Sequence, residues 1–315
     1  MTVPDGPRVV ALGGGHGLAA SLAALRQVAG NLTAVVTVAD DGGSSGRLRT
    51  ELGALPPGDL RMALTALADQ DEWTRLFQYR FGGSGPLAGH AVGNFILTAL
   101  SDVLSGPVPA LDLAGSVLHA AGRVLPMSEQ PVDIVAEVVD ELPDGTASSN
   151  ADTREVRGQV AVATTTGRVV SVRLVPPQPR ACPEAVAAIG SAEAVVLGPG
   201  SLFTSVLPHL LTPELRDAVC QAPGRVVLVL NLVAQQGETS GFSPEAHLDA
   251  LAAQVPELRL DCVIADSAAI SDRAALTAAV ERLGGTLHLG PVAVPGEPRH
   301  DPELLAEAFR KVLGA

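Results

Sequence analysis

Near its N-terminus the chain alternates two short apolar runs with one helical stretch, and this alternation limits the folds open to it. Residues 8–13 form an apolar run that breaks into glycines, residues 18–29 have the 3.6-residue periodicity of a helix, and residues 31–41 are apolar again. A strand, a helix and a second strand in this order are typical of a parallel βαβ unit with a right-handed crossover. The sequence therefore predicts a parallel sheet covered by helices.

Two segments of different texture follow this unit. Between residues 57 and 121 four stretches have helical periodicity, and between residues 132 and 176 three strand-like runs are joined by Asp-Gly and Thr-Gly turns. We expect the first group to form a helical insertion and the second to form a small antiparallel meander, with a polar turn at residues 143–152. From residue 183 onward helices and strands alternate again.

These patterns together predict one domain, a doubly wound, Rossmann-like α/β fold with a mostly parallel sheet, a helical insertion and a small antiparallel β insertion. Hydrophobic residues make up 47% of the chain and aromatic residues 3%, which predicts a sizeable core of alanine, valine and leucine. We expect the first βαβ unit with the helical insertion at residues 8–125, the β insertion at residues 126–180 and the second α/β part at residues 181–315.

Charge and composition limit the ligands and partners of the protein. The formal net charge of −13 opposes binding to nucleic acids and anionic membranes, so neither a nucleic-acid partner nor membrane insertion is expected. Lys311 is the only lysine and lies in a terminal amphipathic helix, which argues against a P-loop or Schiff-base lysine. Anionic ligands must then be held by arginines, backbone amides, helix N-termini or a metal ion.

Three features of the sequence bear on localisation. No apolar run reaches the ~20 residues that a membrane-spanning helix needs. The N-terminus has neither the basic nor the apolar segment of a signal peptide. The three cysteines, Cys182, Cys220 and Cys262, are widely spaced, which suits reduced thiols. The sequence thus predicts a cytoplasmic protein.

A glycine cluster, GGGHG at residues 13–17, directly follows the first predicted strand and opens the first helix. Glycines at this place let the backbone approach a phosphate, and the helix N-terminus favours negative charge. The spacing lacks the third glycine of the dinucleotide fingerprint, which weakens the case for a dehydrogenase. A phosphate site is favoured over a tight turn without ligand. The candidate contacts are Gly13, Gly14, Gly15, His16 and Gly17.

Two adjacent aspartates, Asp40 and Asp41, end the second apolar run. In a Rossmann-like unit an acidic residue at this place binds the ribose hydroxyls, and a carboxylate pair also suits an Mg²⁺ ion that bridges to phosphates. An Asp-Gly turn, in which one aspartate caps the following segment, is the structural alternative. The sequence leaves these interpretations open.

The residues after the aspartates are first small and polar and then basic. The segment GGSSG at residues 42–46 offers amides and hydroxyls to anionic oxygens, and Arg47 and Arg49 follow it. We therefore add Gly43, Ser44, Ser45 and Arg47 to the candidate ligand contacts.

The predicted helical insertion holds three further candidates. Asp59, in LPPGDLR, stands where it would cap the next helix, and this is the role that local sequence favours. His90 and Asn94, in GHAVGN, are spaced i, i+4 and would share one helix face. A packing role and a binding site are equally compatible with this pair.

A second loop of small residues, GPGSLFTS at residues 198–205, follows a predicted strand, and NLVAQQGETSG at residues 231–241 follows another. Because the carboxyl ends of parallel strands meet at one edge of a sheet, we expect both loops to lie beside residues 13–17. Their hydroxyls and amides can bind oxygens. The candidates are Gly198, Gly200, Ser201, Thr204, Ser205 and Asn231.

Taken together, these motifs resemble those of the YvcK/CofD-like family, and the gluconeogenesis-factor (YvcK) branch more than the CofD branch. The similar segments run in order from about Val9 to His300 and so cover most of the chain. They are GGGHGL, TVADDGGSSGRLR, LPPGDLR, LFQYRF, LAGHAVGN, VLGPGSLFTS, QGETSGF and HDP.

Resemblance to the YvcK branch implies a cytosolic regulatory protein that binds a UDP-sugar such as UDP-N-acetylglucosamine. Such a protein is needed for cell shape and envelope homeostasis on gluconeogenic carbon sources. The resemblance implies a diphosphate over residues 13–17 and the Ser201 loop, with the ribose or Mg²⁺ held by Asp40 or Asp41. A homo-oligomer and protein partners in cell-envelope synthesis are compatible with this role.

Resemblance to the CofD branch implies the alternative, an Mg²⁺-dependent 2-phospholactate transferase that moves a phospholactyl group from a nucleotide-activated donor to a deazaflavin. Its adjacent aspartates match Asp40 and Asp41, which would then be candidate catalytic residues and metal ligands. His16 stands where a threonine is common, so no hydroxyl–phosphate contact is expected there. The closer resemblance to YvcK favours a binding protein over an enzyme.

Overall fold

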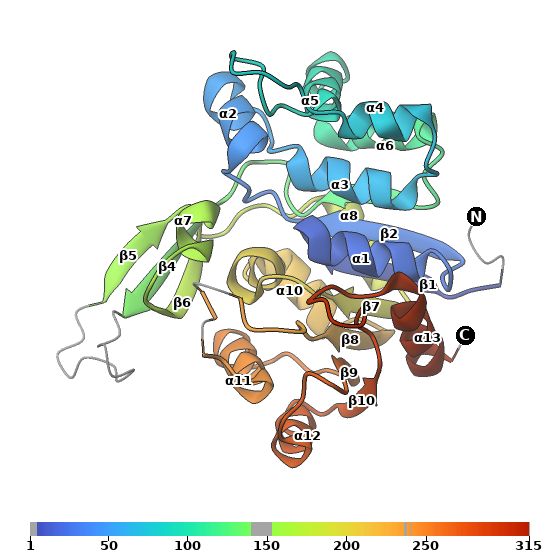
Figure 1. The fold of residues 1–315 in the computed structure, drawn as a ribbon, viewed down its shortest axis with the longest axis vertical. Helices are drawn as coiled ribbons and strands as arrows, with labels where there is room; N and C mark the ends of the chain where they lie inside the picture. The colour runs from blue at the N-terminus through green and yellow to red at the C-terminus, as the bar shows by residue number, and fades with distance from the viewer. Residues whose placement is uncertain (1–4, 140–152, 236–237, 240, 315) are drawn as a thin grey trace.

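The structure is a computed structural model that describes residues 5–139, 153–235, 238–239 and 241–314. Its centre is a seven-stranded sheet in which all neighbouring strands are parallel (Figure 1). The order is β10-β9-β8-β7-β1-β2-β3. This confirms the predicted Rossmann-like, mostly parallel sheet. The strands are β1 (Arg8–Gly13), β2 (Asn31–Val36), β3 (Arg123–Pro126), β7 (Ala194–Leu197), β8 (Arg225–Val229), β9 (Cys262–Asp266) and β10 (Thr286–Gly290).

The chain winds outward from β1 in both directions. It passes from β1 to β2 and then to the edge strand β3, and later returns to β7 on the other side of β1 before continuing to β8, β9 and β10. In the register, Gly13 pairs with Val36 and Leu12 pairs with Leu197, so the carboxyl ends of β2 and β7 flank the end of β1. Open α/β sheets bind their ligands at such a switch point.

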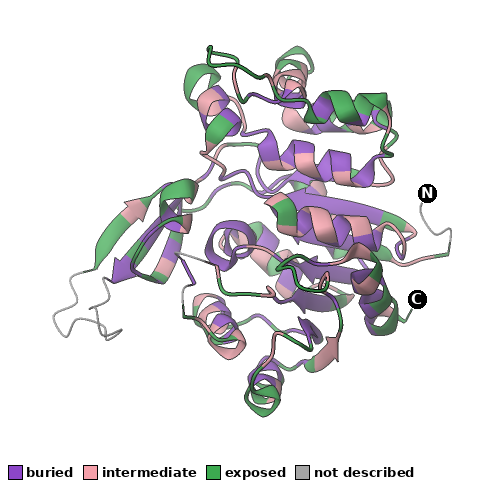
Figure 2. Cartoon of the chain, viewed as in Figure 1, coloured by how far each residue is buried: buried purple, intermediate pink, exposed green. Residues whose placement is uncertain are grey.

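Helices cover both faces of the sheet because its strands are apolar on both sides. Val9 and Ala11 of β1 belong to one core, and Val10 and Leu12 belong to the other. Figure 2 shows the sheet buried between the two helical layers. The first layer consists of α1 (Gly15–Leu25), α3 (Gly58–Leu67) and α13 (Pro302–Leu313), and the second of α8 (Pro183–Gly190), α9 (Leu207–Leu210), α10 (Pro213–Cys220), α11 (Pro244–Gln254) and α12 (Arg273–Arg282).

The helical insertion lies beyond β2 and β3, next to α3 (Figure 1). The third predicted helix of this group, whose start the sequence left open, begins at Val92, because Gly89 has a φ of +78° and Ala91 is extended and bridges to Arg80. No helix in the described part of the chain is long and apolar enough to cross a membrane. The helices of the insertion are α2 (Gly43–Leu52), α4 (Glu72–Gln78), α5 (Val92–Val103) and α6 (Pro107–Val117).

A small antiparallel sheet of three strands, β4 (Asp133–Val139), β5 (Arg154–Arg157) and β6 (Arg168–Val175), confirms the predicted β insertion. The meander order was wrong, since the strand order is β5-β4-β6. Gly158, with a φ of +102°, ends β5 after four residues, and the following segment is a short helix, α7 (Gln159–Ala163), instead of more strand. The polar turn predicted at residues 143–152 lies outside the described residues.

Candidate functional site

The glycine cluster of residues 13–17 connects β1 to α1 at the switch point, and two of its glycines permit close contacts. A Cβ atom on Gly14 would lie 2.5 Å from Thr37 Cγ2 and 2.6 Å from Asp59 Oδ2. A Cβ atom on Gly17 would lie 2.2 Å from the Pro199 carbonyl oxygen. Gly14 is the extended N-cap of α1, with no side-chain cap, so the amides of the first turn other than that of Gly15 are open to a ligand. His16 beside them is exposed.

The second small-residue loop packs against this cluster, as the two strand ends require. The Asn231 side chain holds the loop: it accepts a hydrogen bond from the Gly200 amide (2.9 Å) and donates one to the Gly200 carbonyl (2.7 Å). Ser201 caps the irregular turn η1 (Leu202–Val206), where its Oγ accepts hydrogen bonds from the amide and hydroxyl of Thr204. Ser205 is buried in the same turn. These side chains shape the loop, and the backbone faces the glycine cluster.

The adjacent aspartates Asp40 and Asp41 have different surroundings. Asp40 Oδ1 accepts a hydrogen bond from the Gly42 amide (2.9 Å), and its Oδ2 lies 2.9 Å from the Cβ position of Gly58 at the start of α3. Asp41 Oδ1 instead accepts a hydrogen bond from the Val160 amide (2.9 Å) in the first turn of α7. Asp41 therefore ties the β insertion to the main sheet, and Asp40 faces α3.

Asp59 does not cap its own helix, so the capping prediction was wrong. The N-cap of α3 is Pro57, and α3 has no side-chain cap. Asp59 accepts a hydrogen bond from the Gly15 amide of α1. Burial and the nearby charge of Asp40 raise its pKa to about 7, while the Gly15 amide and Arg61 oppose the rise. Asp40 and Asp59 thus form a carboxylate pair at the glycine cluster.

A divalent cation fits this carboxylate pair. Carboxylate oxygens are the ligands that Mg²⁺ prefers, and a bound cation would favour the ionised form of Asp59 against the charge of Asp40. Asp41, which the sequence paired with Asp40 for this purpose, is engaged with α7. The described residues also contain one cluster of three potential metal ligands, Glu129, Cys182 and Glu184, whose ligand atoms lie within 4.8 Å of one another. This cluster is away from the glycines.

The start of α2 joins a buried polar network. Ser44 Oγ lies 2.8 Å from His90 Nδ1 and accepts a hydrogen bond from Asn94 Nδ2 (2.9 Å). Asn94 Oδ1 accepts in turn from Arg61 Nε (2.9 Å), and Ser45 Oγ accepts from the Gly58 amide (2.9 Å). His90 precedes α5 and shares no helix face with Asn94, but both meet at Ser44. Burial and the charge of Arg47 lower the pKa of His90, which favours neutral imidazole.

Arg47 and Gly43 serve the local structure of the protein. The Arg47 guanidinium donates hydrogen bonds to the carbonyls of Pro86 and Ala88 and so holds the loop before α5. Gly43 is the first residue of α2 and has a φ of +47°, which favours glycine. The row of small residues therefore starts a helix whose Ser44 hydroxyl contacts His90 and Asn94 of the helical insertion and whose Ser45 hydroxyl contacts the start of α3.

Two cavities open on either side of His16. The first, which we call the His300 cavity, has a volume of about 190 Å³. Two of its buried side-chain atoms, Gln235 Oε1 and His300 Nε2, have no hydrogen-bond partner in the described residues. Burial lowers the pKa of His300, and a hydrogen bond between its ring and the Leu230 carbonyl partly opposes this decrease. The cavity is lined by His16, Gly17, Ala20, Pro199, Gly200, Asn231, Leu232, Val233, Gln235, Pro298, Arg299 and His300.

The second cavity, which we call the Arg61 cavity, has a volume of about 420 Å³ and lies between the start of α1, α3 and the end of α4. Its lining includes His16, Arg61 and Arg80. The two cavities therefore share His16, the exposed residue of the glycine cluster.

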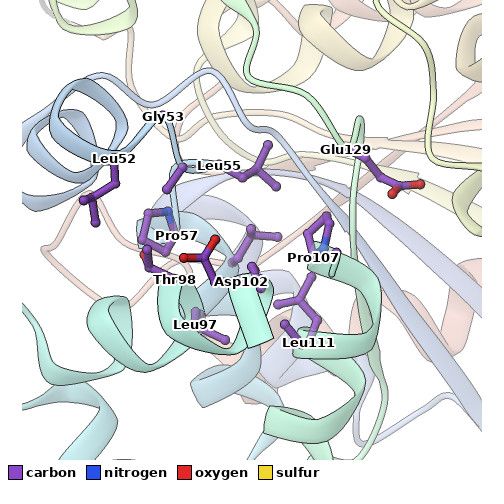
Figure 3. Close-up of a pocket in the computed structure, with 15 residues that line it drawn as sticks. Leu52, Gly53, Leu55, Pro57, Leu97, Thr98, Asp102, Pro107, Leu111 and Glu129 are labelled. Atoms are coloured by element: carbon purple, nitrogen blue, oxygen red, sulfur yellow. The ribbon is translucent and has the colours of Figure 1, made fainter. Parts of the chain in front are cut away.

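A third cavity, of about 200 Å³, lies inside the helical insertion among α2, α3, α5 and α6. Figure 3 shows the Asp102 carboxylate among apolar side chains such as Leu55, Leu97 and Leu111. None of the candidate residues from the sequence lines it. This cavity is separate from the glycine cluster.

Four buried residues near the glycine cluster escaped the sequence selection, although all four stand in the motifs. Thr37 Oγ1 is buried at the end of β2 without a hydrogen-bond partner in the described chain. Glu238, in QGETSG, is 1% exposed, and burial raises its pKa to about 7 against the effect of the nearby Ser201 hydroxyl. Arg61 in LPPGDLR and His300 in HDP are buried as well. For Glu238 and Arg61, the sequence signal that could have identified them was a charged residue inside a motif that contains glycine.

Comparisons with known proteins identify the family of the chain. A family model described as 2-phospho-L-lactate transferase CofD matches residues 9–283. A Mycobacterium tuberculosis protein named "Putative gluconeogenesis factor" is 51% identical over 305 residues, which cover 95% of this chain and 88% of that protein. A Listeria monocytogenes protein named "Gluconeogenesis factor" is 40% identical over 256 residues, which cover 81% of this chain and 76% of that protein.

A solved structure supports the same assignment at the level of the fold. The crystal structure of a UPF0052 family member from Bacillus halodurans superposes with a TM-score of 0.85 at 32% sequence identity. The match covers 97% of this chain and 99% of that one. Family model, relatives and fold therefore point the same way, and the chain belongs to the CofD/YvcK family, among relatives that carry the name gluconeogenesis factor.

Proposed function

We propose that this protein is a cytoplasmic regulator of the gluconeogenesis-factor type that binds a UDP-sugar at the switch point of its sheet. The observation that carries the proposal is the pair of buried, unpartnered acceptors, Gln235 Oε1 and His300 Nε2, in a cavity that borders the glycine cluster. Buried polar atoms are normally hydrogen-bonded, so unpartnered ones at a cavity wall are suited to a polar ligand.

Uracil has the complementary groups for this cavity. Its imide N–H needs an acceptor, which neutral His300 or the Gln235 carbonyl supplies, and its carbonyls need a donor such as the Gln235 amide. The volume of about 190 Å³ suits a base and part of a ribose and is too small for a whole nucleotide sugar. The diphosphate and sugar would therefore extend out of the cavity along the glycine cluster.

The diphosphate would lie at the open N-terminus of α1, where amides and the helix dipole favour anions. Arg299, an exposed residue of the same cavity whose Nε pairs with Glu297, would bring a guanidinium group to the phosphates from the loop before α13. An Mg²⁺ ion held by Asp40 and Asp59 would supply charge neutralisation for the phosphates. In this proposal the ligand is recognised without being changed, and its occupancy is reported to protein partners in cell-envelope synthesis and cell shape.

A second candidate function is transfer of a phosphorus-containing group. The family model that matches is that of a 2-phospho-L-lactate transferase. Asp59, with a pKa near 7, also suits a group that takes up or releases a proton at neutral pH. We place this function second, since binding alone accounts for the cavity and its unpartnered acceptors.

Isothermal titration calorimetry tests the first proposal. UDP-N-acetylglucosamine, UDP and GDP are titrated with and without Mg²⁺ into the wild-type protein, into Gln235→Leu and into Gln221→Leu, an exposed glutamine at the end of α10. We expect the uridine ligands to bind with micromolar affinity, Gln235→Leu to weaken them at least tenfold, and Gln221→Leu to leave them unchanged. Affinity no tighter than about 1 mM, or about −4 kcal/mol, would overturn the proposal.

Mass spectrometry of a separate reaction mixture tests the transferase function. A nucleotide-activated phospholactate is incubated with the protein, Mg²⁺ and a deazaflavin acceptor. Formation of the phospholactyl product that is lost in Asp59→Asn would promote the transferase function above the regulatory one. Recovery of unchanged donor and acceptor, with UDP-sugar binding intact, supports the regulator.

A further inference from the structure

The Arg61 cavity has the composition of an anion site. It lies between α1 and α3 of the first helical layer and the end of α4 in the helical insertion, and α3 contacts both of the other helices (Figure 1). None of its lining residues is acidic, and they include two arginines, a histidine and two glutamines. The complete lining is His16, Ala19, Arg61, Met62, Thr65, Ala66, Gln70, Gln78 and Arg80.

Arg61 is the buried member of this set. It is 5% exposed, and its Nε donates to the neutral Asn94 amide oxygen. No salt bridge to Arg61 within 4.0 Å occurs in the described residues. Burial and then the charge of Arg80 lower its pKa to about 10, with Asp59 opposing. A buried guanidinium without a paired anion is unfavourable, so its cavity favours a bound anion.

Arg80 brings a second guanidinium to the same cavity. It is exposed, and one of its amino groups donates to the Gly89 carbonyl (2.8 Å), which fixes its position. The residues described show no carboxylate within ion-pair distance of it. Guanidinium groups bind the oxygens of phosphates and carboxylates in a fork-like geometry, and the carboxamides of Gln70 and Gln78 add neutral donors.

From these observations we infer a second ligand site in the Arg61 cavity, for a compact dianion with phosphate or carboxylate oxygens. It neighbours the proposed nucleotide site across His16 but shares no other lining residue with it. The inference goes beyond the proposed function, because the second site takes a small oxyanion metabolite and not the nucleotide. A protein with both sites responds to two ligands, and His16 is the residue through which one can influence the other.

Substitutions at Ala66 give the sharpest test. Ala66 lines the cavity from within α3, so Ala66→Glu places a carboxylate beside the two arginines, and Ala66→Gln is a control of the same size without charge. Thermal unfolding is followed in chloride and in inorganic phosphate or malonate at equal ionic strength. We expect phosphate, malonate or both to raise the Tm of wild type and of Ala66→Gln, and to leave Ala66→Glu unchanged. We also expect Ala66→Glu to have the higher Tm of the two variants in chloride.

Arginine variants provide a test that does not depend on packing at Ala66. Arg80→Gln removes a charge at the cavity, and Arg75→Gln removes one from α4, where Arg75 pairs with Glu72 at the surface. Calorimetry with phosphate and malonate should show at least tenfold weaker binding for Arg80→Gln and less than twofold change for Arg75→Gln. UDP affinity should stay within twofold in both variants.

Three outcomes would overturn the inference. The first is no response of the wild-type protein to phosphate or malonate beyond that of chloride. The second is an equal response in Ala66→Glu and Ala66→Gln. The third is parallel loss of phosphate and UDP affinity in Arg80→Gln, which would make the cavity part of the nucleotide site. Failure of UDP to bind at all would overturn the proposed function and leave the phosphate result to stand by itself.

Discussion

Asp59 in α3 accepts a hydrogen bond from the Gly15 amide at the start of α1, and the charge of Asp40 acts on it from the loop between β2 and α2. Three elements that are separate in the sequence therefore meet at one carboxylate. Burial and Asp40 raise the pKa of Asp59 to about 7, so the proton on this group is released near neutral pH. We therefore expect the stability of the protein to depend on pH through this group.

We expect Asp59→Asn to stabilise the protein at pH 8 relative to wild type, with little difference at pH 4. The folded-state pKa of about 7 lies above the ordinary 3.8, so wild-type stability falls as pH rises between these values and is level above them. Asparagine removes this loss, which is on the order of a few kcal/mol. Urea unfolding at both pH values measures it. Asp71→Asn is the control. Hydrogen bonding from Thr74 lowers the pKa of Asp71, so this substitution should destabilise the protein at pH 8 instead of stabilising it.

The neighbouring aspartates offer a matched pair for the metal prediction. Asp40→Asn should abolish the effect of Mg²⁺ on UDP-sugar affinity, because it removes one carboxylate of the proposed cation site. Asp41→Asn should retain that effect and lower stability by no more than about 1 kcal/mol, because the asparagine oxygen still accepts the Val160 amide and only the charge of the acceptor is lost. Calorimetry with and without Mg²⁺, together with urea unfolding, separates them. Loss of the Mg²⁺ effect in both variants would restore the pairing of Asp40 with Asp41 that the sequence suggested.

The difference between these aspartates shows what the sequence could not reveal. The switch point and the meeting of small-residue loops follow from strand–loop–helix order, because parallel strands end at one edge. Which way Asp40 and Asp41 turn depends on α3 and α7, which are distant in sequence. The meander order failed for a similar reason, since the turn at Gly158 sends β6 to the free edge of β4.

The burial of charged residues was the other feature that could not be predicted from the sequence. Arg61 and Glu238 stand in motifs that were recognised for their glycines, and nothing local distinguishes a buried charge from a solvated one. Their burial results from contacts among loops and helices that meet only in the folded chain. The helix after His90 begins only at Val92, because the positive φ of Gly89 interrupts the chain before it, and periodicity does not encode this angle.

Gly17→Ala should destabilise the protein by about 3 kcal/mol or more. Its Cβ would lie 2.2 Å from the Pro199 carbonyl oxygen, so the glycine cluster and the loop after β7 would have to separate. Gly82→Ala is the control, since its Cβ meets nothing within 4 Å. Denaturant midpoints of the two variants provide the measurement. Equal midpoints would mean that the two loops do not pack as described.

Thr37→Val separates stability from binding at the glycine cluster. Thr37 is buried, its Oγ1 has no hydrogen-bond partner in the described residues, and its Cγ2 packs against Gly14. Valine keeps the methyl group and replaces the unpartnered hydroxyl, so we expect the free protein to gain up to about 1 kcal/mol in urea unfolding. If the hydroxyl serves the phosphates beside Gly14, UDP affinity falls about tenfold in the same variant. Serine at this position keeps the hydroxyl and should retain affinity while losing packing. A valine variant that is less stable than wild type and binds UDP equally well would show that Thr37 has a partner in the folded protein.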